Sequence, residues 1–151
     1  ALAVFLIICF SVSALGGLVT PTSVGTWYQL LDKPGFNPPD WVFFPVWSLL
    51  FLTIAISGWL AWRVAGPSRG LSFILYGLQL LINFAWSCLF FGLQSPLGGL
   101  VCIVALLFAI GANVRAFLGV SRLAGLLLIP YASWACFAAV LNACIWWLNR
   151  G

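Results

Sequence analysis

The residues best suited to chemistry in this 151-residue chain are tryptophans and uncharged amides. Asn83 lies in the middle of an apolar run, with Gln79 four residues before it and Ser87 four residues after it. Residues four apart share one face of a helix, so these polar side chains are expected to point into a bundle of helices. Hydrogen bonding between helices is one explanation for Gln79 and Ser87. The central place of Asn83 also favours a polar contact to a ligand.

Three tryptophans, Trp47, Trp86 and Trp134, lie some way inside apolar runs, where anchoring at the membrane interface explains them poorly. Residues at spacings of four extend the faces of Trp47 and Trp134: Phe51, Ala138 and Asn142. Buried indoles can stack against a large aromatic guest and donate an N–H to it, and alanines leave room for a flat ligand. The pattern predicts a site for a flat lipophilic molecule, with helix packing alone as the alternative.

Other kinds of site lack their residues. The chain has no histidine, and its two acidic residues, Asp32 and Asp40, both fall between the first and second apolar runs. This excludes a histidine-ligated haem, a histidine base and a Cys/His metal site. Proton-coupled transport usually needs an ionisable group within a span. The arginines are scattered and the five cysteines lie inside apolar runs. We therefore expect no metal, no required cofactor, no disulfide and no nucleic-acid partner.

The elements that position these residues follow from composition. Hydrophobic residues make up 64% of the chain and charged residues 5%, with a mean hydropathy of +1.18. A surface so poor in charge suits lipid rather than water. Charges and Pro-bearing breaks divide the chain into five apolar runs long enough to span a bilayer. The sequence predicts an all-α integral membrane protein, a single domain over 1–151, with helices at about 2–20, 42–63, 71–92, 96–115 and 123–147.

The N-terminal run has an alternative, because residues 1–15 could imitate the apolar core of a signal peptide. The run lacks a basic segment and continues to about Thr20, which favours a span. Five spans place the basic residues unequally on the two sides: Arg63, Arg69, Arg115 and Arg122 against Lys33 and Arg150. The positive-inside rule then predicts a non-cytoplasmic first loop and C-terminus.

The first loop, about residues 21–41, is predicted to cover the bundle as a lid. Its prolines limit backbone freedom, so that ordering the loop costs little entropy. An ion pair between Lys33 and Asp40 would contribute only about 0–1 kcal/mol, so aromatic packing must hold the lid. A connector with no ligand beneath it is the alternative. The lid residues are Trp27, Lys33, Pro34, Phe36, Asn37, Pro38, Pro39, Asp40 and Trp41.

These segments also resemble a known family. The run WYQLLDKPGFNPPDWVFFPVW over 27–47 resembles the first loop and second helix of the translocator protein family. Its members are also called tryptophan-rich sensory proteins and peripheral-type benzodiazepine receptors (TspO/MBR). The resemblance continues in NFAWS at 83–87, LIPYASW at 128–134 and AAVLN at 138–142. The order and spacing of these fragments make the combination highly specific.

The resemblance implies a five-helix bundle, often a dimer, whose pocket is closed by the first loop and binds porphyrins such as protoporphyrin IX. Trp47 and Trp134 match the family's pocket tryptophans, and Tyr28 matches a further pocket position. With the residues found above, the expected ligand-binding set is Tyr28, Trp47, Phe51, Asn83, Trp86, Ser87, Trp134, Ala138 and Asn142. The expected partners are a porphyrin or another flat lipophile, membrane lipid and a second copy of the chain.

The leading hypothesis is a tetrapyrrole-binding membrane sensor or receptor. Light-dependent degradation of the porphyrin is a possible enzymatic activity, with Trp47 and Trp134 as electron donors and no conventional acid or base. The alternatives are a carrier that moves porphyrin or another lipophile downhill and a regulatory scaffold. The chain departs from the family at Phe36, where tryptophan is common, and at Ala143, the tyrosine position of the sterol motif. Tight sterol binding is therefore not expected.

Overall fold

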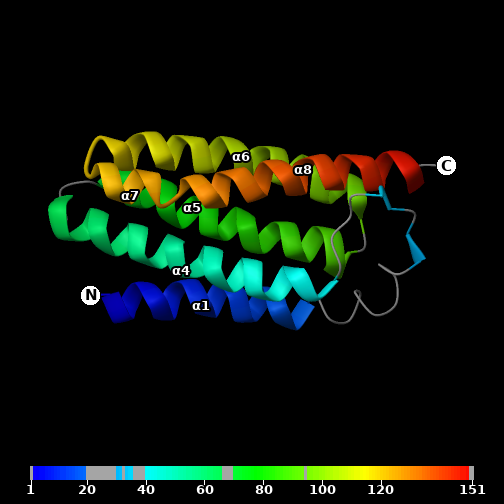
Figure 1. Ribbon diagram of the computed structural model, residues 1–151, viewed down its shortest axis with the longest axis horizontal. Coiled ribbons are helices and arrows are strands. Elements are labelled where there is room, and N and C mark those ends of the chain that lie inside the picture. The colour runs from blue at the N-terminus through cyan, green and yellow to red at the C-terminus, as the bar shows by residue number, and fades with distance from the viewer. Residues whose placement is uncertain are drawn as a thin grey trace.

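The structure, a computed structural model, describes residues 2–19, 30–31, 33–35, 40–65, 70–93 and 95–149. Within these ranges every regular element is a helix, which confirms the predicted all-α class. The long helices run along the longest axis of the molecule (Figure 1). They are α1 (Leu2–Val19), α4 (Asp40–Ala65), α5 (Gly70–Ser87), α6 (Pro96–Leu118) and α8 (Ile129–Asn149).

The helices form a ring. Helix α1 packs on α4 and α5, α5 packs on α6, and α6 packs on α8. The ring closes where α4 meets α8 and the short helix α7 (Arg122–Leu126). The side chains that point inward from this ring line one shared interior, which is where the predicted site residues must meet.

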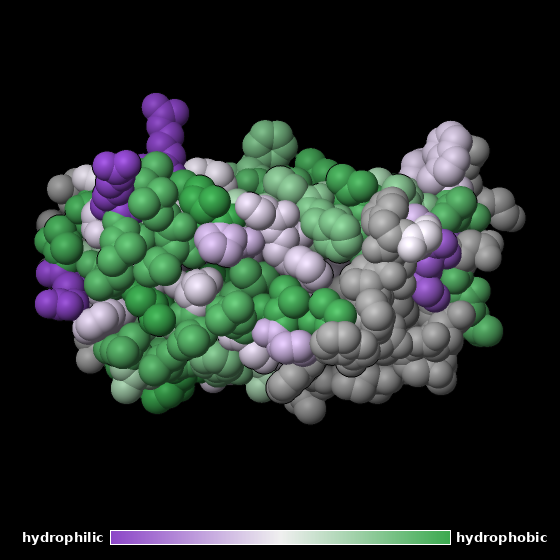
Figure 2. All heavy atoms as spheres, in the orientation of Figure 1, coloured by the Kyte–Doolittle hydropathy of each residue, from purple (hydrophilic) through white to green (hydrophobic). Residues whose placement is uncertain are grey.

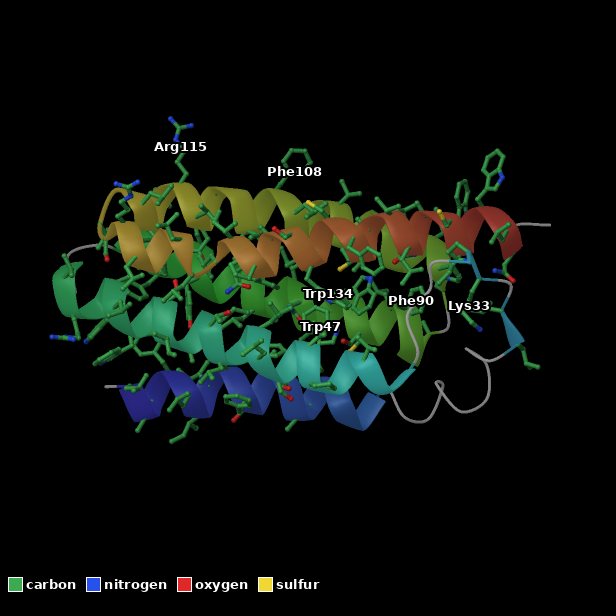
Figure 3. All side chains as sticks on the ribbon, in the orientation of Figure 1. Lys33, Trp47, Phe90, Phe108, Arg115 and Trp134 are labelled. Carbon is green, nitrogen blue, oxygen red and sulfur yellow. The ribbon has the colours of Figure 1, made fainter. Side chains whose placement is uncertain are left out.

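The distribution of polarity is that of a membrane protein. In the described residues, α4, α5, α6 and α8 each contribute buried polar side chains to the interior. Large apolar residues such as Phe108, 76% exposed, point outward from α6 (Figure 3). Apolar residues cover much of the described surface in view, and the most hydrophilic residues lie toward its ends (Figure 2). Within the described ranges, four helical segments are long and apolar enough to cross a membrane: Pro45–Val64, Gly70–Phe90, Pro96–Leu118 and Arg122–Asn149. In α1, a shorter apolar segment covers 2–15. The chain is an integral membrane protein.

The third apolar run, expected as one helix over 71–92, changes its geometry before it ends. Helix α5 stops at Ser87 and continues as one π-helical turn, η2 (Cys88–Gly92). There the Leu93 N–H donates to the Cys88 carbonyl at 2.8 Å, five residues back. Such turns occur mostly as single insertions and often at functional sites. Helix α6 then starts with a Ser95 cap, whose hydroxyl accepts from the Gly98 N–H at 3.0 Å.

The last apolar run, expected as one helix over 123–147, is divided into α7 and α8. Pro130 has no N–H for an intrahelical bond and disfavours helical geometry in the residue before it. The Leu128 N–H instead donates to Gly125 at 3.1 Å, three residues back, and the regular pattern resumes at Ala132. Gly125 is required here because a Cβ at this position would lie 2.5 Å from the Leu118 side chain.

Most of the predicted lid lies outside the described residues: Trp27, Phe36, Asn37, Pro38 and Pro39. Helix α4 begins at Asp40, so Asp40 and Trp41 belong to its first turn rather than to the loop. Lys33 donates from Nζ to the Leu31 carbonyl at 3.2 Å. The Lys33–Asp40 ion pair and the lid itself stay predictions.

Candidate functional site: an indole cluster in the bundle interior

Three tryptophans from three different helices meet inside the ring, and we call them the indole cluster. Trp47 of α4 has its ring centroid 6.4 Å from that of Trp86 of α5 and 6.5 Å from that of Trp134 of α8. The first pair is tilted by 32° and the second is edge-to-face at 88°. Figure 3 shows Trp47 and Trp134 converging between their two helices. These distances lie in the range of favourable aromatic pairs.

Three phenylalanines enlarge the cluster. Phe51 lies 6.0 Å from Trp47, Phe90 stacks on Trp86 at 5.4 Å, and Phe137 lies 5.3 Å from Trp134, all between ring centroids. Phe51 was expected in the site, whereas Phe90 and Phe137 were not. Their spacing was a usable signal, because each follows a cluster tryptophan by four or three residues on the same helical face.

Asn142 holds Trp86 in place. The Trp86 indole Nε1–H donates to Asn142 Oδ1 at 3.1 Å, and Asn142 Nδ2 donates to the Pro96 carbonyl at 2.7 Å. One amide therefore joins α5, α6 and α8. Gly99 of α6 permits this contact, since a Cβ there would lie 2.8 Å from Asn142 Oδ1 and 2.9 Å from the Phe90 ring.

Asn83, expected to contact a ligand, already has a protein partner. Its Nδ2 donates to the Tyr131 hydroxyl at 2.8 Å, and both residues are buried. Tyr131 was absent from the predicted set although it shares the face of Trp134. Ala138 is buried in the same core, whereas Ser87 is half-buried at the end of α5. Tyr28 lies outside the described residues.

Nearer the start of α5, polar contacts connect three of the helices in the ring. The Tyr76 hydroxyl donates to the Ile54 carbonyl at 2.8 Å and lies 3.2 Å from the Cys9 thiol, which joins α5, α4 and α1. Gly58 of α4 lies directly beneath the Tyr76 ring, where a Cβ would approach to 2.6 Å. Below the indole cluster, toward the start of α5, these contacts pack α1, α4 and α5 closely around Tyr76.

The arrangement suits recognition of a flat aromatic molecule. The described lining is aromatic and amide, and the sequence from Leu71 to Val114 contains no charged residue. Indole faces stack on π-systems, and amides supply uncharged hydrogen bonds. The rings contact one another in this structure, so a guest must displace ring–ring contacts to enter. Among the described rings of the cluster, the electron-rich indoles are the groups that can donate an electron.

Known proteins are similar to this chain over most of its length. The model of the TspO/MBR family matches residues 5–148. A tryptophan-rich protein TspO from Chlorobaculum tepidum is 42% identical over 94% of this chain and 91% of its own length. The human translocator protein is 37% identical over 83% of this chain and 76% of its own. A tryptophan-rich sensory protein from Cereibacter sphaeroides is 32% identical over 91% and 84%. The chain belongs to the TspO/MBR family.

Proposed function

We propose that this protein is a membrane sensor or receptor that binds a porphyrin, such as protoporphyrin IX, against the indole cluster. The observation that carries the proposal is the convergence of Trp47, Trp86 and Trp134 inside an apolar bundle. A macrocycle offers the large flat π-face that such indoles stack on, and burial in a concave apolar site supplies the rest of the affinity. The names of two relatives, tryptophan-rich sensory protein and translocator protein, agree with a sensing or receptor role.

In this proposal the three tryptophans of the cluster have different roles. Trp86 is held by Asn142 and presents a fixed ring, whereas Trp47 and Trp134 are the rings that part to admit the ligand. In this proposal the first loop, which ends where α4 begins at Asp40, covers the entrance. In light, the excited porphyrin would accept one electron from an indole, leaving a tryptophan radical cation and a reduced porphyrin. The chain contributes position and the exclusion of water.

A dark titration tests the binding proposal. The detergent-solubilised protein is titrated with protoporphyrin IX while porphyrin absorbance and tryptophan fluorescence are followed. The test variant is Trp47→Phe/Trp134→Phe. The matched control is Trp62→Phe/Trp147→Phe, which also removes two indoles, but from positions that are 41% and 57% exposed on the outer surface.

The wild type and the control should bind saturably at micromolar porphyrin. The cluster variant should bind about tenfold more weakly, since each aromatic contact contributes about 0.5–1.5 kcal/mol and 1.4 kcal/mol is a factor of ten. Equal affinities for both variants would place the ligand elsewhere. No saturable binding by the wild type would refute the proposal and favour a regulatory scaffold.

Illumination of the same samples separates binding from degradation. Light-dependent loss of porphyrin should occur with the wild type and the control and be absent with the cluster variant, even at porphyrin concentrations that saturate it. Loss at an unchanged rate would remove the indoles from the photochemistry. Movement of porphyrin into sealed vesicles in the dark would instead favour the downhill carrier.

We further propose that the first loop and the C-terminus are non-cytoplasmic and that the protein is a homodimer. The exposed Arg63, Arg115 and Arg122 lie where α4 and α6 end and α7 begins, at the end of the bundle opposite Lys33 (Figure 3). This matches the positive-inside rule. Reporter fusions after residue 151 should be active only when the reporter works outside the cytoplasm, and light scattering in detergent should give the mass of two chains.

A further inference from the structure

Helix α5 carries four buried polar residues, Ser72, Tyr76, Gln79 and Asn83, and three of them have hydrogen bonds to other helices. The Tyr76 hydroxyl donates to the Ile54 carbonyl of α4, Asn83 donates to Tyr131 of α8, and the backbone carbonyl of Ser72 accepts from Asn113 Nδ2 of α6 at 3.3 Å. Gln79 is the exception. It is 0% exposed, and neither its Oε1 nor its Nε2 has a hydrogen-bond partner among the residues that the structure describes.

The position of Gln79 makes this unusual. It lies one turn from both Tyr76 and Asn83, and seven residues, or about 10 Å along the helix, from Trp86. A carboxamide has two N–H donors and an oxygen with two lone pairs. Inside a lipid-embedded bundle no bulk water reaches these groups, and an unpaired amide destabilises the fold. A glutamine at this position therefore needs a partner from outside the described protein atoms.

The surroundings define the chemistry of that partner. Because Gln79 offers both donors and an acceptor, the partner must both accept and donate a hydrogen bond. No charged residue occurs between Leu71 and Val114, so nothing on α5 balances an ion. The partner is therefore neutral and small enough to fit among buried side chains.

We infer that the Gln79 carboxamide is a binding site for a neutral group that donates and accepts hydrogen bonds, below the indole cluster. Two sources have this chemistry. One is an internal water molecule, which bridges polar groups in closed interiors. The other is a neutral polar group of a lipophilic ligand that passes the indoles. For a porphyrin this is a side-chain carboxyl group in its protonated form, because the ionised form is charged and only accepts hydrogen bonds. Only this second source rests on the proposed porphyrin function.

Magnetic resonance of the glutamine side chains tests the inference on the full-length protein. Selective labelling of glutamine side-chain nitrogen gives signals from three residues, Gln29, Gln79 and Gln94. The pair lost in Gln79→Met identifies Gln79. A cross peak between its amide protons and water in the ligand-free protein establishes the water source. A shift of the same signals only on addition of protoporphyrin IX establishes the ligand source.

The melting temperature of a Gln79 variant provides the result that would contradict the inference. If the amide is bound to a partner, Gln79→Met should leave the melting temperature unchanged or lower it. Leu80→Met, at the neighbouring position, which is also buried, controls for the new methionine. The inference is overturned if Gln79 shows neither a water cross peak nor a porphyrin-dependent shift and Gln79→Met melts higher than the wild type. Failure of porphyrin binding alone leaves the water measurement intact, so the two proposals fail separately.

Discussion

Replacement of Gly99 by alanine tests whether Asn142 joins three helices as the structure indicates. The new Cβ would lie 2.8 Å from Asn142 Oδ1, 2.9 Å from Phe90 Cδ2 and 3.1 Å from Phe90 Cβ. Real Cβ atoms do not approach so closely, so Asn142, Phe90 or the α6 backbone must shift. Any shift of Asn142 strains both its bond to the Pro96 carbonyl and its bond from the Trp86 indole.

The magnitude follows from three terms. Overpacking a buried site costs about 1–3 kcal/mol. Loss of two interhelical hydrogen bonds costs about 0.6 kcal/mol each. Alanine in place of glycine within a helix returns up to about 1 kcal/mol. We expect Gly99→Ala to lower the free energy of unfolding by about 1–3 kcal/mol.

Gly111→Ala is the matched control, because Gly111 lies on the same helix and a Cβ there meets nothing within 4 Å. It should retain only the helix-propensity gain and be as stable as the wild type or slightly more stable. Unfolding of both variants in mixed micelles, followed by circular dichroism, gives the comparison. Gly99→Ala should also change tryptophan fluorescence, since Trp86 loses its fixed acceptor. If the two variants prove equally stable, the close contact does not govern this junction.

Three further predictions concern contacts between the helices in the bundle interior. Gly58→Ala should destabilise the protein by about 1–3 kcal/mol because its Cβ would meet the Tyr76 ring at 2.6 Å, whereas Gly77→Ala, in open space, should not; equal melting temperatures would contradict this. Tyr76→Phe should lower the free energy of unfolding by about 0.6 kcal/mol, the mean for a hydrogen bond within a membrane bundle, in the same unfolding assay. A variant more stable than the wild type would show that the hydroxyl is poorly paired. A double-mutant cycle with Asn83→Leu and Tyr131→Phe should give a coupling of about 0.6 and at most about 1.7 kcal/mol; zero coupling would remove the bond between them.

Part of the site was predictable because helical periodicity is local. Asn83, Trp86 and Trp134 face inward as their spacing indicates, and Trp47 carries Phe51 on the same face. The partners of these residues were not predictable. The sequence does not determine the axial position of α5 relative to α8. This position brings Trp86 to Asn142 rather than to another polar side chain.

The breaks in the helices show the same division. Pro130 carries a local signal for the turn between α7 and α8, because the cause lies in its missing N–H, although the run was expected to be one helix. The π-turn at η2 (Cys88–Gly92) has no comparable signal, because no proline or missing N–H lies within it. A break caused by the chemistry of one residue, such as Pro130, can be recognised in the sequence, whereas the π-turn at η2 cannot.

The sequence by itself determined that the protein is surrounded by lipid, that it is helical and which residues face inward. Low charge content indicates the first, and helical periodicity, which involves only neighbouring positions, indicates the others. The tertiary structure alone decided which inward residues are satisfied. Asn83 was expected at a ligand and is bonded to Tyr131. For Gln79 an interhelical hydrogen bond was one explanation, and its amide has no partner among the described residues. Hydrogen bonds need both partners within about 3 Å, and only the assembled ring of helices fixes distances of that kind.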